Sequence, residues 1–132
     1  MGDMKTIIRS LIVCFVMLGA PCVSAQSLSA DQQLRTFAAC AGRLSAVIEY
    51  QWMFDGEASE VTQTQRTAVL QLIAAVIPEG MGRDVLHWRL SAKLAQSALL
   101  TRATFNDDAS DAIWASRRAE RLTRECTSLL LS

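Results

Sequence analysis

The chain has 132 residues but only one histidine, two prolines and four cysteines, and its 13 basic residues balance 13 acidic ones. One histidine leaves a zinc site short of its usual three or four ligands from Cys, His, Asp and Glu. No Cys-x-x-Cys-His sequence is present, which excludes this form of haem attachment. The lack of net positive charge argues against nucleic acid, because proteins that bind it are strongly basic. We therefore expect no metal, no cofactor and no nucleic-acid partner.

The single histidine, His87, does not belong to a recognisable catalytic set. Asp84 and Ser91 lie within about one helical turn of it. A catalytic triad places the nucleophile and the carboxylate on different ring nitrogens, which three residues of one straight helix do not readily achieve. The acidic residues within 107–111 lack the glycine and the closing glutamate of a calcium loop, so we interpret them as a helix cap.

Residues 1–25 are typical of a secretory signal peptide. Two basic residues precede an apolar run over residues 11–18, and a small residue, Ala25, stands at the expected cleavage position. We expect this leader to be removed and residues 26–132 to form one exported domain with no stable membrane span. Its location would be the periplasm if the source is a Gram-negative bacterium, and otherwise the outside of the cell.

Two alternatives for the leader remain open. A retained membrane anchor requires about 20 apolar residues, whereas Arg9, Gly19 and Pro21 interrupt this stretch. Lipidation at Cys22 requires a leucine three residues earlier, whereas Leu18 lies four residues before it. Cleavage fits the residues better than either alternative.

The cysteine content becomes informative once the leader is removed. Cys14 and Cys22 leave with it, and Cys40 and Cys126 remain. An exported protein with two cysteines most simply joins them. We therefore expect a Cys40–Cys126 disulfide that closes a loop of 86 residues.

Four segments with helical periodicity fill the rest of the chain, and no strand pattern is present. A Ser29–Gln32 capping box opens the first, and Pro78 ends the second. Short connections place consecutive helices antiparallel, so the sequence predicts an all-α fold, a small four-helix up-down-up-down bundle. The expected helices are residues 29–54, 59–77, 83–105 and 108–129.

The apolar residues of two helices make further predictions. Residues 68–77 are apolar on nearly every side, which is typical of a helix at the centre of its bundle. The last helix carries a narrow, alanine-rich seam that permits close helix approach. The seam consists of Ala112, Ala115, Ala119, Leu122, Cys126 and Leu129.

In such a bundle, the first and third interhelical turns lie at the same end, and five aromatic residues lie beside them. They either close the end of the core or, if exposed, form an interaction patch, because aromatic residues dominate binding hot spots. The five are Tyr50, Trp52, Phe54, Phe105 and Trp114.

The main charge cluster consists of four arginines in the expected last helix: Arg117, Arg118, Arg121 and Arg124. Glu120 and Glu125 stand at four-residue spacings that allow ion pairs with Arg124 and Arg121. The cluster is either a solvated face or a surface for an anionic partner, such as a lipid headgroup or an acidic protein.

The sequence contains no nucleophile–base pair, ligand set or phosphate loop. We therefore expect an exported protein that acts by binding an unidentified protein partner in the periplasm or envelope, and not by catalysis. One alternative is a carrier of an apolar ligand, since bundle interiors accept such ligands. Another is a carboxylate enzyme using Glu49, Asp55 or Glu57, which requires a buried acid with a raised pKa.

Overall fold

A computed structural model describes residues 28–131, which form four α-helices and no strand within that range. The helices are α1 (Ala30–Phe54), α2 (Gly56–Val76), α3 (Gly82–Phe105) and α4 (Ala109–Ser128). The prediction of an all-α fold with four helices is therefore confirmed. The expected signal peptide lies outside the described residues. None of these four helices is both long and apolar enough to span a bilayer.

Side-chain caps start α1 and α4 as the sequence predicts. Ser29 Oγ accepts a hydrogen bond from the Gln32 backbone, and the Gln32 side chain accepts one from the Ser29 backbone. The Asp108 carboxylate accepts from the backbone N–H groups of Ser110 and Asp111. These bonds satisfy donors that have no partner within the helix itself.

A single residue, Asp55, links α1 to α2. Its N–H donates to the Gln51 carbonyl at the end of α1, and its carboxylate accepts from the Ala58 N–H at the start of α2. Because one aspartate serves both helix ends, α2 begins at Gly56 and not at Ser59, where we expected it.

The link between α2 and α3 is longer and contains the expected Pro78. Proline has no N–H to continue the helical hydrogen bonds. Gly80 takes a φ of 81°, a left-handed conformation that glycine adopts without steric cost. The chain thereby reverses direction before α3.

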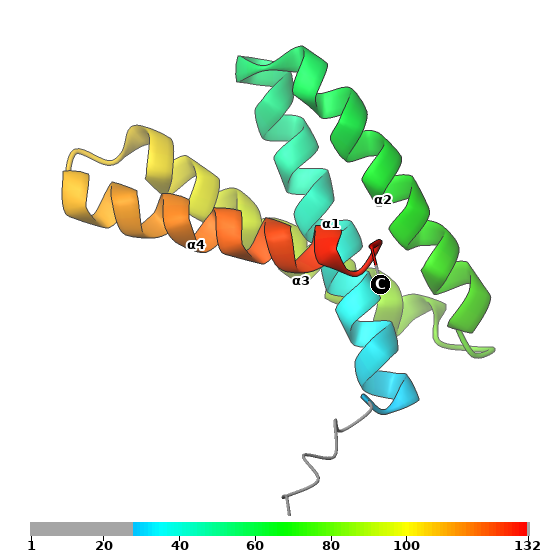
Figure 1. The fold of residues 1–132 in the computed structure, drawn as a ribbon. Helices are drawn as coiled ribbons and strands as arrows, with labels where there is room; N and C mark the ends of the chain where they lie inside the picture. The colour runs from blue at the N-terminus through cyan, green and yellow to red at the C-terminus, as the bar shows by residue number, and fades with distance from the viewer. Residues whose placement is uncertain (1–27, 132) are drawn as a thin grey trace, which may run out of the picture.

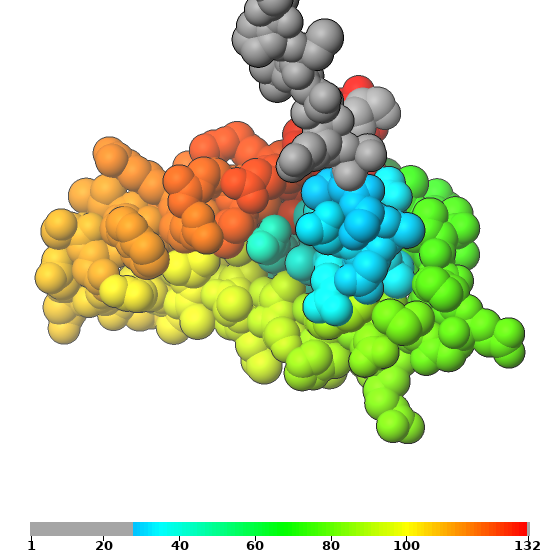
Figure 2. All heavy atoms as spheres, turned by 90° about the horizontal axis from the view of Figure 1, so that it is seen from below, coloured from blue at the N-terminus to red at the C-terminus, as the bar shows by residue number. Residues whose placement is uncertain are grey.

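The helices form two antiparallel hairpins, α1–α2 and α3–α4, which cross at a wide angle (Figure 1). α1 packs against each of the other three helices and α3 packs against α4, whereas α2 makes no comparable contact with α3 or α4. Seen from below, the α3–α4 hairpin extends as an arm away from α1 and α2 (Figure 2). The described helices therefore do not close into the expected bundle. The two hairpins form the two arms of a V, which meet where α1 packs against α3 and α4.

The crossing depends on Gly42 in α1. A Cβ atom at this position would lie 2.1 Å from the Arg89 carbonyl oxygen and 3.0 Å from the Lys93 nitrogen. Hence α1 and α3 touch backbone to backbone, whereas in a closed bundle they would be diagonal neighbours separated by core side chains. This close approach is the physical reason why the two hairpins cross.

α1 is the central helix. It buries ten residues, compared with four in α2, two in α3 and four in α4. The prediction that the second helix is central is therefore wrong. Ala74, Ala75 and Val76 of α2 are exposed, because α2 packs chiefly on one neighbour and small apolar side chains are common on protein surfaces.

Cys40 and Cys126 form the predicted disulfide between α1 and α4. Their Cα atoms lie 5.2 Å apart, and both side chains are buried. The α4 seam also faces the interior, since Ala115, Ala119 and Leu122 are buried. The disulfide fixes the C-terminal part of α4 to the middle of α1, and the two helices diverge beyond it (Figure 1).

Candidate functional site

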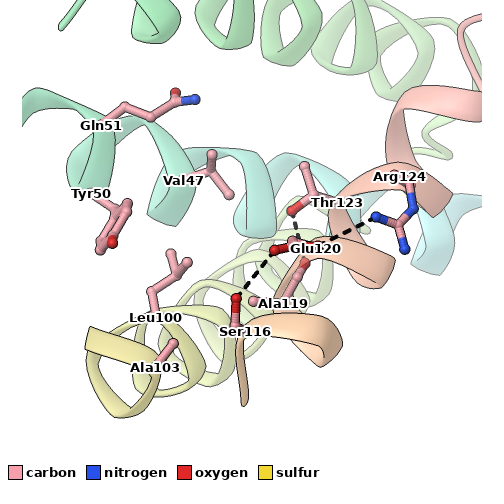
Figure 3. A pocket seen from close by; sticks show the side chains of 10 residues that line it. All are labelled: Val47, Tyr50, Gln51, Leu100, Ala103, Ser116, Ala119, Glu120, Thr123 and Arg124. Carbon is pink, nitrogen blue, oxygen red and sulfur yellow. Dashed lines mark hydrogen bonds and ion pairs between the residues drawn. The ribbon is translucent and has the colours of Figure 1, made fainter. Parts of the chain in front are cut away.

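The two arms of the V meet in an open notch of about 410 Å³ (Figure 3). α1 supplies one wall, and α3 and α4 supply the other. Apolar side chains from all three helices line it, with polar side chains along α4. The residues of this notch are Val47, Tyr50, Gln51, Leu100, Ala103, Ser116, Ala119, Glu120, Thr123 and Arg124.

The polar side chains of the notch on α4 are already paired within the chain. Ser116 Oγ donates to Glu120 Oε1 over 3.1 Å, and Arg124 Nη1 lies 3.6 Å from Glu120 Oε2 (Figure 3). Thr123 Oγ1 donates to the Ala119 carbonyl over 3.0 Å. With these groups satisfied, what the notch offers to a ligand is mainly its apolar surface.

Gln96 fixes the α4 wall of the notch. Its side chain is fully buried, and its Nε2 donates to the Ala119 carbonyl over 3.1 Å and to Thr123 Oγ1 over 3.3 Å. Its Oε1 is buried without a hydrogen-bond partner, which costs stability. Sequence reasoning missed Gln96, because one glutamine within a long helix gives no signal.

The five predicted aromatic residues occupy two places and not one. The Tyr50 ring contacts the Phe54 ring near the end of α1 in a tilted arrangement, with 4.7 Å between ring centres, and its hydroxyl lies 3.0 Å from Thr104 Oγ1 of α3. Trp52 is also near the end of α1, whereas Phe105 and Trp114 flank the α3–α4 turn, which lies far from the α1–α2 turn (Figure 1). Four of the five are more than half exposed, so they do not close a core: Trp52, Phe54, Phe105 and Trp114.

The tip of the α3–α4 hairpin is held by Arg102 and Asp111. The Arg102 guanidinium donates twice to the Asp111 carboxylate, and Asn106 Nδ2 donates to the same group. Arg102 also lies 5.1 Å from the centre of the Trp114 ring, in a cation–π contact. The hydrogen bond from Arg102 is the largest cause that holds the pKa of Asp111 below its ordinary 3.8.

This contact predicts a pH-dependent tip. A carboxyl whose folded pKa is lowered contributes stability above its unfolded pKa and loses that contribution as the pH falls through the folded pKa. We expect the Asp111 carboxyl, followed by carbon-13 NMR, to titrate with a midpoint below 3.8. The Arg102→Gln variant should raise the midpoint toward the ordinary aspartate value, with the Asn106 hydrogen bond still lowering it. An unchanged midpoint in that variant would contradict the assignment.

The predicted arginine cluster lies mostly on the exposed face of α4, with Arg118 half-buried. The predicted ion pair between Glu120 and Arg124 is present, whereas no ion pair to Glu125 occurs among the described residues. Arg43 of α1 adds a further cation. Burial is the largest cause that lowers the pKa of Arg43, Glu125 raises it, and Arg118 lowers it.

The three carboxylates of the enzyme alternative are exposed: Glu49, Asp55 and Glu57. Glu49 pairs with Lys93 over 2.5 Å, and Asp55 caps α2. His87 is likewise exposed on α3. Within residues 28–131, no three side chains of His, Cys, Asp or Glu converge as a metal site would require. The enzyme alternative stays an untested prediction.

Comparison with protein-family models, with curated proteins and with solved structures finds no match for this chain. Function must therefore be argued from the geometry. Of the predicted site residues, only Tyr50 and Arg124 line the notch. Sequence reasoning missed the others because they come from three helices whose relative placement depends on the crossing at Gly42.

Proposed function

We propose that this protein is exported, that it holds an amphipathic helix of a partner protein in the notch, and that it acts by this binding and not by catalysis. The observation that carries the proposal is the divergence of α4 from α1 above the disulfide, which leaves an apolar notch open at the apex of the V (Figures 1 and 3).

A helix is the occupant that the walls of the notch suit best. Its walls are themselves helices, and helix surfaces pack by fitting ridges of one into grooves of another. Along α4, the notch extends from Ser116 to Arg124, a rise of about 12 Å or two turns. Insertion of an apolar helix face into such a groove is a common mode of peptide recognition.

A different protein suits the notch better than a second copy of this chain. A symmetric pair would place one concave notch against another and leave the space between them unfilled. A head-to-tail contact that inserts an α3 face into the next molecule would build a ring or a filament of many copies. A protruding helix of another protein fills the notch without either problem.

The disulfide supports the proposed export, because disulfides persist in oxidising compartments such as the periplasm and the outside of the cell. The proposal of binding without catalysis is supported by the lining of the notch. Its carboxylate, Glu120, is exposed and already paired with Ser116 and Arg124.

Site-specific photo-crosslinking in the exporting host tests this proposal. The photoreactive residue p-benzoylphenylalanine is placed at Ser116 in the notch or, as a matched control, at Ser91, an exposed serine of α3. We expect position 116 to give a covalent adduct with one protein, and the crosslinked peptide to come from an amphipathic helix. Position 91 should give no such adduct.

Three other results would overturn the proposal. An adduct of a small molecule at position 116 would favour the carrier of an apolar ligand. An adduct with a second copy of the chain would replace the partner by self-association. Equal adducts at positions 116 and 91 would show that the notch has no special affinity.

A further inference from the structure

A second cavity, of about 190 Å³, lies between α1, α2 and α3, next to the crossing at Gly42. Its lining contains three cations, Arg66 of α2 and Arg89 and Lys93 of α3, but only one carboxylate, Glu49 of α1. A concave site with excess positive charge concentrates anions. Since three helices contribute these side chains, no sequence spacing could reveal the site.

Two of the three cations form no ion pair with any residue in the range 28–131. Lys93 Nζ is neutralised by Glu49 at 2.5 Å. Arg66 Nε donates to the uncharged Ser45 hydroxyl over 2.7 Å. The Arg89 guanidinium makes no hydrogen bond or ion pair with any other residue in the described part of the chain. Arg66 and Arg89 therefore leave most of their donors available to a ligand.

Arg66 is also close enough to Arg89 to affect its charge. Burial is the largest cause that lowers the pKa of Arg89, and the charge of Arg66 lowers it further. Like charges in a partly desolvated place disfavour each other's charged form. A bound anion would offset both effects, because it would bring a negative charge beside Arg66 and Arg89 while Glu49 is paired with Lys93.

The edge of this cavity is apolar. Leu86 and Leu90 line it and are 50% and 51% exposed, and Leu94, four residues further along α3, is 70% exposed. We call these three the leucine row. Because the leucine row follows α3 away from the charged cavity, an alkyl chain attached to a bound headgroup can lie along it. The cavity itself has room for a headgroup but not for a long chain.

We propose that Arg66 and Arg89 bind the anionic headgroup of an amphiphile, a carboxylate or a phosphate, whose alkyl chain lies along the leucine row. The planar guanidinium fork matches the oxygens of both headgroups. The alkyl chain would bury leucine surface that the free protein exposes, which favours binding by the hydrophobic effect. This site is separate from the notch and does not depend on the proposed function.

Isothermal titration calorimetry of the oxidised protein tests the site. The probes are dodecyl phosphate and dodecanoate below their micelle concentrations, with inorganic phosphate and dodecyl maltoside as controls for the head and the tail. We expect saturable binding of one or both anionic amphiphiles. Arg66→Gln and Arg89→Gln should each weaken it tenfold or more, whereas Arg83→Gln, an exposed arginine of the same α3, should leave it unchanged.

Each outcome decides the proposal, with circular dichroism checking that every variant is folded. Tighter binding of dodecyl phosphate or of dodecanoate names the headgroup. If inorganic phosphate binds as tightly as dodecyl phosphate, the leucine row plays no part in binding. The same conclusion follows if the Leu90→Ser variant binds the amphiphile as tightly as the native protein does. If dodecyl maltoside binds as tightly as the anionic amphiphiles, Arg66 and Arg89 do not recognise the headgroup. The same conclusion follows if Arg83→Gln weakens binding as much as Arg66→Gln or Arg89→Gln does.

Discussion

Replacing both Cys40 and Cys126 by alanine should lower the free energy of unfolding by about 4 kcal/mol, close to the value that the chain-entropy model gives for a loop of 86 residues. The crosslink restricts the unfolded chain over most of the described residues. It also joins the two arms of the V at the place where α4 leaves α1, and α4 has little other contact with α1. Urea unfolding of the oxidised protein and of the variant measures the difference.

Reduction of the native protein provides the control. The reduced protein and the double variant should unfold at nearly the same urea concentration, because both lack the same crosslink. A loss of less than about 1 kcal/mol would contradict this prediction and would mean that helix packing alone holds the arms together.

Gly42→Ala should destabilise the protein by about 2 kcal/mol. Overpacking a close contact costs about 1–3 kcal/mol and occasionally more, and the better helix propensity of alanine offsets about 1 kcal/mol of the cost. The added Cβ would meet the Arg89 carbonyl oxygen at 2.1 Å. A backbone atom cannot swing aside as a side-chain end can, so α1 and α3 must separate.

Gly82→Ala is the matched control for this substitution. Gly82 also lies in a helix, but nothing lies within 4 Å of a Cβ added there. Alanine at this position should leave stability unchanged or raise it by about 0.4–1 kcal/mol, since it restricts the unfolded chain. Equal unfolding free energies for Gly42→Ala and the native protein would show that α1 and α3 are not in backbone contact.

Local features of the fold could be predicted from the sequence. The Ser29–Gln32 capping box, the end of α2 before Pro78 and the buried seam of α4 depend on neighbouring residues, and each is present in the structure. The Cys40–Cys126 disulfide followed from a count of cysteines. These features need no knowledge of how the helices are placed.

The placement of the helices could not be predicted in the same way. A glycine at position 42 lowers the helix propensity of this segment. Nothing in the sequence indicated that the backbone of α3 would pack against it. Short turns indicate antiparallel neighbours, but they do not say which pairs of helices cross. The expected meeting of the five aromatic residues at one end failed for this reason, since Trp114 lies on the arm that projects away.

The candidate sites were hidden by the same uncertainty. The notch and the cationic cavity each combine residues of three helices, so their composition follows from the crossing and not from any motif. Gln96 and Arg89 were unremarkable in the sequence and acquired roles only through burial and through neighbours on other helices.

The most direct test of the central claim uses the helical segment identified by crosslinking from position 116. A synthetic peptide of that segment is titrated with the oxidised protein and followed by circular dichroism. We predict one-to-one binding in which the peptide gains helicity. Ser116→Arg places a long charged side chain in the notch and should abolish this binding. Ser91→Arg, on the exposed face of α3, should leave the binding unchanged. Binding without a gain in helicity, or equal loss in both variants, would contradict the proposal that the notch holds a partner helix.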